Sequence, residues 1–377
     1  MDRTRFRARL SAIASARAGG MALVVIALAG CAARTLSIGF IGDITGKESE
    51  LGVSGRNGAQ LRIEEANSRG ELRGRLVRLV TENDNNKPES FRSAVDSLVA
   101  LGIPAAIGPY TSSMAELAST DGRIFFLSPT ASAESLSGRD DMLFRLVTPS
   151  SVGARALGEK AASRLRAKTA SILYDSDNDA YAKGFISSFI ASFEAAGGQV
   201  LSSTSFSSSA KDLRFAPILI EILAKRPSAL LTIATGSDTA LVIRRAKQLS
   251  PGILPLASGW AATTDFLKFG GAAMDGTLFE QQFDPADTSP AYRDFVTAYK
   301  ARFGSYPSFS SMYSYEAAGV LLHAMKGKDS PSAIKRRILA DPRVHGLQSD
   351  YAFDPYGDVL REDSVFIVKG DGYQALK

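Results

Sequence analysis

The sequence predicts an α/β protein of two doubly wound parallel-sheet lobes. From Leu36 onward, short apolar runs alternate with stretches whose apolar residues recur at helical spacing. Several of the runs are apolar throughout, which suits strands that helices cover on both faces of a parallel sheet. Strand–helix alternation of this kind is typical of α/β folds, and the chain is long enough for two domains.

The first 31 residues predict a lipoprotein signal. Five arginines precede residue 20, and the apolar run MALVVIALAG (21–30) is short for a membrane span. It ends at Leu28-Ala29-Gly30-Cys31, which resembles the bacterial lipobox, and Cys31 is the only cysteine. We expect residues 1–30 to be removed as a signal peptide and Cys31 to carry a lipid anchor in the membrane. The alternative is an ordinary signal peptide with a chance cysteine.

Seven strands are predicted in the rest of the chain, each from a short run rich in apolar residues. They are LSIGFIG (36–42), LVRLVTE (76–82), PAAIGP (104–109), RIFFLSP (123–129), SILYD (171–175), ALLTIA (229–234) and ILPLAS (253–258).

Amphipathic helices are predicted between and after these strands. The three clearest apolar stripes are Phe91/Ala94/Val95/Leu98/Val99, Phe185/Ile186/Phe189/Ile190/Phe193 and Tyr292/Phe295/Val296/Tyr299. Each is interpreted as a face turned to the core. Because no low-complexity linker divides the chain, the two lobes must be joined by crossings inside the fold. Three extended stretches are candidates: FRLVTPSS (144–151), GTLFEQQF (276–283) and YAFDPYGD (351–358).

Composition favours binding over catalysis. The formal net charge is +5, but most of it comes from the leader arginines. The cluster Arg69, Arg73, Arg75, Arg78 lacks interleaved aromatic residues, so it is interpreted as a solvated helix-to-strand turn and no nucleic-acid partner is expected. The G-x-S-x-G and G-x-G-x-x-G patterns are absent, and two histidines with one cysteine are too few for a zinc or copper site. We expect no enzyme activity, metal or cofactor.

Two loops rich in hydroxyl groups mark the expected ligand site. Gly108-Pro109-Tyr110-Thr111-Ser112-Ser113 follows one predicted strand, and Ser128-Pro129-Thr130-Ala131-Ser132 follows the next. Ligands of open α/β sheets bind beyond the carboxyl ends of strands, where helix N-termini and hydroxyl donors favour an anion such as a carboxylate. The alternative is that Ser112 and Ser132 only cap helices.

The order and the amino-acid sequences of several segments resemble those of the Leu/Ile/Val-binding family of type I periplasmic binding proteins, which serve ABC transporters. The segments are IGFIGDITG (38–46), NGAQLRIEEANSRG (57–70), AAIGPYTSS (105–113), FFLSPTASAESL (125–136), DSDNDAYAKGF (175–185) and YRDFVTAYKARFGSYPSFSSMYSYEAAGVL (292–321). The resemblance covers essentially all of the chain after the leader.

The resemblance implies two lobes joined by three strands, closing by a hinge on a ligand in the cleft. We assign residues 36–148 with 282–349 to the first lobe, and 149–281 with 350–377 to the second. By resemblance, the expected ligand-binding residues are those of the two hydroxyl loops, a tyrosine that closes over the ligand, and three further contacts: Ser112, Ser113, Thr130, Ser132, Tyr181, Leu51, Thr235 and Trp260.

One feature of the family is missing. Its amino-acid binders hold the ligand's ammonium group with a glutamate at the tip of the strand that matches ILPLAS, where this chain has Ser258-Gly259-Trp260-Ala261. Trp260 either packs between the lobes or stacks on the ligand. Asp43, Asp177 or Asp238 could supply the charge. Without an acid at the tip, the ligands are expected to be aromatic, larger aliphatic or non-amino carboxylates rather than the simple Leu/Ile/Val set.

The leading interpretation is a lipid-anchored solute receptor of an ABC importer that captures a small carboxylate-bearing ligand, an amino acid or a related compound, and presents it to a permease. The alternative is an envelope lipoprotein that uses the same fold to regulate a cell-wall enzyme or sensor by protein contact. In either case the protein is exported and anchored at Cys31 on the periplasmic side of the inner or outer membrane.

Overall fold

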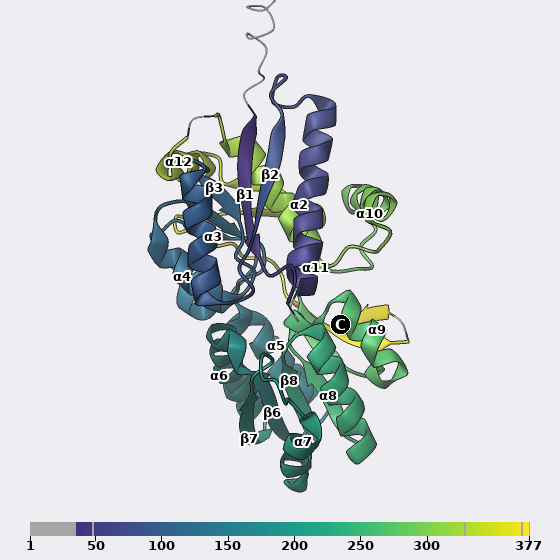
Figure 1. Ribbon diagram of the computed structural model, residues 1–377. Helices are drawn as coiled ribbons and strands as arrows, with labels where there is room; N and C mark the ends of the chain where they lie inside the picture. The colour runs from purple at the N-terminus through teal and green to yellow at the C-terminus, as the bar shows by residue number, and fades with distance from the viewer. Residues whose placement is uncertain (1–34, 47–48, 328, 371, 377) are drawn as a thin grey trace, which may run out of the picture.

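The computed structural model describes residues 35–46, 49–327, 329–370 and 372–376, so the leader and Cys31 lie outside the described residues. Figure 1 shows two lobes, one above the other, each with a sheet flanked by helices. The predicted two-lobe α/β fold is confirmed. Among the described residues, no helix combines the length and the apolar character that crossing a membrane requires.

The first lobe is built on a five-stranded parallel sheet in the order β2-β1-β3-β4-β5. Its strands are β1 (Leu36–Gly42), β2 (Val77–Asn83), β3 (Ala105–Ile107), β4 (Phe125–Ser128) and β5 (Leu143–Arg145). Its helices are α2 (Ser49–Arg69), α3 (Pro88–Ala100), α4 (Ser112–Asp121), α10 (Pro290–Phe303), α11 (Phe309–Ala324) and α12 (Pro331–Ala340).

Helices cover both faces of this sheet. Phe40 and Ile41 are both fully buried, although neighbouring residues of a strand point to opposite faces. Phe40 belongs to the apolar cluster that includes α2 and α11 residues, and Ile41 to the cluster that includes α3 and α4 residues. The uninterrupted apolar run in β1 follows from this double burial. The arginine cluster lies where α2 ends and β2 begins, so its interpretation as a helix-to-strand turn is confirmed.

The second lobe has a seven-stranded sheet in the order β14-β13-β10-β9-β8-β6-β7. Its parallel strands are β6 (Thr169–Asp175), β7 (Gln199–Phe206), β8 (Ala229–Ile233), β9 (Leu254–Ala257) and β10 (Leu278–Gln281). The hairpin β13 (Ser364–Lys369) and β14 (Gly372–Ala375) adds an antiparallel edge that the sequence does not predict. The helices are α5 (Ser150–Ser163), α6 (Asp179–Ala195), α7 (Phe215–Ala224), α8 (Gly236–Leu249) and α9 (Thr264–Gly270), with 3₁₀ turns η2 (Ser176–Asn178), η3 (Gly259–Ala261) and η4 (Gly271–Met274).

The chain passes between the lobes after β5, after β10 and before β13, and Thr148 ties the three passages together. Its backbone N–H donates to Gln282 Oε1 at 2.9 Å. Its hydroxyl donates to the carbonyl of Arg361 at 3.0 Å and accepts from the N–H of Arg361 at 2.6 Å. A single buried residue on the first passage therefore contacts the other two, with its backbone bound to Gln282 and its side chain to Arg361.

The third passage lies later than the sequence predicts. Residues 350–358, assigned to the second lobe, pack against the first. Strand β12 (Asp350–Ala352) pairs with β11 (Arg343–His345), and the ring of Phe353 lies 5.5 Å from that of Phe144. The carboxylate of Asp358 also pairs with the guanidinium of buried Arg145 at 2.5 Å. Aromatic packing and this ion pair keep the segment on the first lobe until about residue 359.

Candidate ligand-binding site

A small cavity lies between the two lobes, beside the passages that join them. Its volume is about 60 Å³, whereas a single water needs about 10–15 Å³ by the same measure. The cavity therefore suits a compact molecule. It is lined by Leu51, Tyr110, Ser112, Thr130, Ser132, Val147, Thr148, Ser150, Gly153, Asn178, Tyr181, Gly259, Trp260, Glu280, Gln281, Gln282, Phe309, Tyr313 and Asp363.

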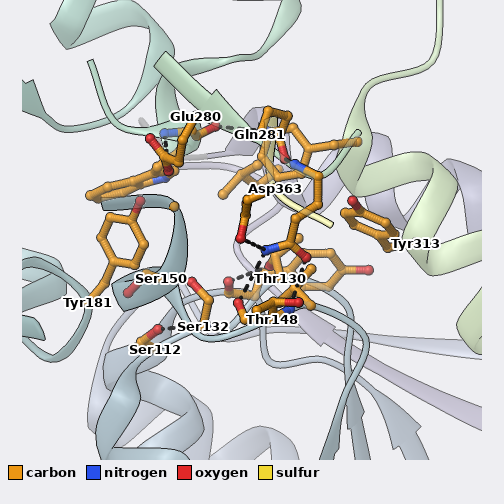
Figure 2. Close-up of a pocket in the computed structure, with 18 of the residues that line it drawn as sticks. Ser112, Thr130, Ser132, Thr148, Ser150, Tyr181, Glu280, Gln281, Tyr313 and Asp363 are labelled. Carbon is orange, nitrogen blue, oxygen red and sulfur yellow. Dashed lines mark hydrogen bonds between the residues drawn. The ribbon is translucent and has the colours of Figure 1, made fainter. Parts of the chain in front are cut away.

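Ser112 and Ser132 form one wall of the cavity, at the start of helix α4 (Figure 2). Ser112 does not cap a helix. Its hydroxyl oxygen accepts hydrogen bonds from the backbone N–H groups of Ser132 and Ala133, each at 3.1 Å. Because a hydroxyl has two lone pairs and one proton, the O–H proton of Ser112 is the part that is left to donate to a ligand.

Ser150, the first residue of α5, continues this wall from the second lobe. Its N–H donates to the carbonyl of Ser132 at 2.7 Å, which sets the start of α5 against the hydroxyl loop. Its buried hydroxyl has no hydrogen-bond partner among the described residues. Thr130 lines the cavity too, but its hydroxyl donates to the carbonyl of Tyr110 at 2.5 Å. Two helix N-termini and three serine hydroxyls thus converge on one end of the cavity, an arrangement suited to an anion.

Aromatic and apolar side chains form the sides of the cavity. The rings of Tyr181 and Trp260 meet edge to face with centroids 5.8 Å apart, and both residues are buried. Trp260 therefore both packs against Tyr181 and borders the cavity. Leu51, Phe309 and Tyr313 come from the first lobe. Burial raises the pKa of Tyr181 and Tyr313 above the ordinary value, so both stay neutral phenols at physiological pH.

The opposite end of the cavity is acidic, and Figure 2 shows Glu280 on the far side from Ser112 and Ser132. Glu280 lies on β10, with one carboxylate oxygen accepting the N–H of Gly259 at 2.8 Å. The other oxygen is buried and has no partner among the described residues. Burial, with a smaller contribution from the nearby charge of Asp363, raises the pKa of Glu280 well above its ordinary value.

Asp363, just before β13, is the second acid at this end. Its carboxylate lies 3.4 Å from the side-chain amide of Gln282, and burial raises its pKa to about 7. Gly153 in the first turn of α5 leaves the room that both acids occupy. A methyl group placed there would lie 2.3 Å from Cγ of Glu280 and 3.2 Å from Oδ1 of Asp363.

The lobes also touch outside the cavity. The N–H of Ser113 donates to the side-chain carbonyl of Asn178 at 3.2 Å, and Ser151 donates to Glu134. On another side, Glu50 accepts from the hydroxyl of Thr264 at 2.5 Å and from the N–H of Asp265 at 3.2 Å. These contacts join the first lobe to the second and make this a closed arrangement of the cleft.

The structure brings six of the eight predicted ligand-binding residues to the cavity: Leu51, Ser112, Thr130, Ser132, Tyr181 and Trp260. Two predicted residues do not line it. Thr235 instead caps α8, where its hydroxyl accepts the N–H of Asp238 at 3.2 Å. Ser113 faces Asn178 at the rim, where its hydroxyl lies 3.4 Å from the side-chain carbonyl oxygen of that residue.

The three aspartates considered as replacements for the missing glutamate do not line the cavity. Asp43 accepts the N–H groups of Thr45 and Gly46. Asp177 and Asp238 instead bind neighbouring serines: Asp177 accepts from Ser207 and Ser209, and Asp238 from Ser208. Hydrogen bonds from groups of their own lobe hold all three carboxylates, and none of the three lines the cavity.

Sequence reasoning missed both acids of the cavity. Glu280 lies in GTLFEQQF, which was interpreted only as a crossing, and Asp363 lies in the polar stretch REDS after Leu360. Glu280 could have been found from the sequence, because it is an acid inside an apolar strand and a charged residue in a buried strand needs a partner. Ser150 was equally visible, because it follows a proline and opens an amphipathic helix.

Comparisons with known proteins agree with this geometry. A family model described as periplasmic binding protein matches residues 35–358. The Leu/Ile/Val-binding protein homolog 3 of Brucella melitensis is 24% identical over 322 residues, with 84% of this chain and 86% of that protein aligned. The leucine-, isoleucine-, valine-, threonine- and alanine-binding protein of Pseudomonas aeruginosa is 23% identical over 358 residues, with 91% and 92% aligned. The crystal structure of a leucine-binding protein from Thermotoga maritima matches with a TM-score of 0.80 at 25% identity, covering 91% of this chain and 98% of that one.

Proposed function

The chain belongs to the periplasmic binding protein family, and from this premise we propose that it is the lipid-anchored receptor of an ABC importer. In this role it captures a small carboxylate-bearing ligand between its lobes and presents it to the permease. The relatives support the solute-receptor role, because those described above are named as binding proteins for leucine, isoleucine, valine, threonine or alanine. The lipobox at Cys31 supports the anchor.

The observation that carries the proposal is the hydroxyl wall. Among the residues that the structure describes, the O–H proton of Ser112 has no acceptor and the buried hydroxyl of Ser150 has no partner, while Ser132 contacts both residues through its backbone. A buried polar group without a partner is costly, and a ligand carboxylate would satisfy several such donors at once. The N-termini of α4 and α5 add favourable partial positive charge at the same point.

Capture by hinge closure is supported by the way in which the lobes meet. Within the described part of the chain, three passages join them, and the contacts at the rim of the cleft include polar pairs such as Ser113 with Asn178 and Glu50 with Thr264. Polar rim contacts can exchange for water when the lobes separate, whereas the passages around Thr148 keep their own hydrogen bonds.

The proposal is tested by titrating the purified protein with small carboxylates, among them L-alanine, L-leucine, propionate and benzoate. Binding is measured by calorimetry and by tryptophan fluorescence. Trp260 is the only tryptophan in the chain and borders the cavity, so binding should change its emission. Ser132→Ala should weaken binding by about 1–3 kcal/mol. Ser93→Ala, exposed on α3, is the matched control and should bind like wild type. Equal affinity of wild type and Ser132→Ala would contradict the placement of the carboxylate.

A further inference from the structure

The arginine cluster at the turn from α2 to β2 does not line the ligand cavity, and the receptor role leaves it without a task. On the basis of the lipid anchor in the proposed function, we propose that the surface around the start of β1 docks on a membrane that carries anionic lipid head groups. This surface, the tether face, consists of residues 35–37, 69–78, 101–104 and 325–327, which are the starts of β1 and β2, the turn before β3 and the end of α11.

The anchor holds the tether face close to the membrane. Cys31 precedes Thr35, the first described residue, by four residues, and β1 follows directly. Because an extended chain spans at most about 3.3–3.6 Å per residue, the start of β1 stays within about 14 Å of the backbone of Cys31. This distance is comparable to the Debye length of about 8–10 Å at physiological salt, over which a charged membrane attracts cations.

The tether face lies at the opposite edge of the sheet from the ligand. Strands β1 to β5 are parallel, so all of them begin at one edge, and cavity residues such as Ser112 and Thr130 follow strand ends at the other. Figure 1 shows β1 beginning at the end of the first lobe that points away from the second lobe. Docking there leaves the cleft facing the solution from which ligand arrives, and a reversible contact lets the receptor leave the surface to meet its permease.

The tether face is strongly basic. Its segments contain five basic residues and a single acid, Glu71, whose carboxylate already pairs with Arg62 at 2.7 Å and with Arg69 at 3.6 Å. The other four basic residues take part in none of the ion pairs found among the described residues: Arg73, Arg75, Arg78 and Lys326.

Hydrogen bonds hold two of these cations at the tether face. Arg78 donates to the hydroxyl of Ser37 in β1 at 2.9 Å, and Arg75 donates to the carbonyl of Lys326 at 2.7 Å. Cations also stabilise the C-terminal ends of helices, and α2 and α11 both end here. That role does not explain Arg78, which lies in a strand and is exposed.

Two exposed leucines flank the start of β1. Leu76, before β2, is 54% exposed and Leu101, before β3, is 57% exposed, and β2 and β3 are the two neighbours of β1 in the sheet. The N–H of Leu36 donates to the carbonyl of Leu76 at 2.8 Å. A lone exposed leucine is ordinary. A pair on both sides of a lipid tether, among cations, matches interfacial membrane contacts, where apolar side chains enter the head-group region beside Lys and Arg.

The test uses the full processed chain, lipidated at Cys31, in vesicles of phosphatidylcholine alone or mixed with phosphatidylglycerol. Since acylation blocks the only native thiol, Leu101→Cys provides a unique site for a fluorescent label, which lipids with nitroxide head groups quench on contact. Ile220→Cys, on α7 of the second lobe, is the matched control because Ile220 is also 57% exposed. We expect quenching in Leu101→Cys only, stronger with phosphatidylglycerol, and weakened at about 1 M salt, where the Debye length is about 3 Å.

The contribution of charge is tested in the Leu101→Cys background. Arg73→Gln should lower the ratio of quenched to unquenched label about 5-fold, the effect of one cation at an anionic surface. Arg226→Gln is the matched control, because Arg226 is exposed on the second lobe and has the same φ of 53° as Arg73. Neither substitution should change ligand affinity in calorimetry, since neither residue lines the cavity.

Three outcomes decide between docking and a merely solvated turn. Quenching that is specific to Leu101→Cys, requires phosphatidylglycerol and falls in Arg73→Gln supports the proposal. Equal quenching in Leu101→Cys and Ile220→Cys, or quenching that is insensitive to both lipid charge and Arg73→Gln, overturns it, while ligand binding by the same sample leaves the receptor role standing. A processed chain without lipid, as measured by mass spectrometry, overturns the anchor and the docking together.

Discussion

Ser112→Ala should damage both ligand binding and the stability of the empty protein. Ser112 is almost completely buried, and its hydroxyl oxygen is the acceptor for the N–H groups of Ser132 and Ala133. Alanine keeps the shape of the backbone but removes that acceptor. The two N–H groups then stay buried between the hydroxyl loop and α4 without a partner.

The size of the effect follows from these two contacts. An unsatisfied buried N–H costs about 1–3 kcal/mol, so two of them should lower the free energy of unfolding by about 2–4 kcal/mol once partial relaxation is allowed. Loss of the O–H donor should separately weaken carboxylate binding by about 1–3 kcal/mol, which is about 5-fold to 150-fold.

Two neighbouring serines provide the matched comparison. Since the buried hydroxyl of Ser150 has no partner among the described residues, Ser150→Ala should leave the free energy of unfolding unchanged or slightly raised while ligand affinity falls. Ser132→Ala should likewise change stability little. Urea unfolding without ligand, followed by far-ultraviolet circular dichroism, measures the first property, and calorimetry measures the second. If Ser112→Ala unfolds at the wild-type urea concentration, the assigned hydrogen bonds do not hold the loop.

Three further predictions concern other parts of the molecule. Glu316→Gln should lower the free energy of unfolding by about 3–5 kcal/mol, because it leaves the buried guanidinium of Arg361 without its counter-charge; a urea midpoint equal to that of wild type would contradict this. As the pH rises from about 4 to 7, the free energy of unfolding of the empty protein should fall, because folded Asp363 keeps a proton that an unfolded aspartate has lost. Cys31→Ser should abolish incorporation of labelled fatty acid in a host that processes lipoproteins, and an unlabelled wild type would refute the anchor.

The sequence alone determined the architecture and one end of the site. Hydrophobic periodicity is a local property, so uninterrupted apolar runs such as β1 and stripes such as Phe185/Phe189/Phe193 identified buried strands and helix faces without three-dimensional information. The hydroxyl loops were also readable, because both follow predicted strands and the carboxyl ends of parallel strands meet at one edge. Ser112 and Ser132 accordingly lie together at the cavity.

Only the tertiary structure decided which charges reach the cleft. Whether a carboxylate points to a ligand depends on which backbone N–H groups lie near it, and those come from residues far away in the sequence. Asp43 is held in its own loop and Asp177 by Ser207 and Ser209, which follow β7. Glu280, in contrast, crosses to Gly259 in the turn after the neighbouring strand β9, and Asp363 arrives on the last passage between the lobes. The third passage lies later in the chain than predicted for the same reason, because Phe353 packs on Phe144, about 210 residues earlier in the chain. Periodicity along the chain predicts what is buried, but the partner of a buried charge is set by packing between distant segments.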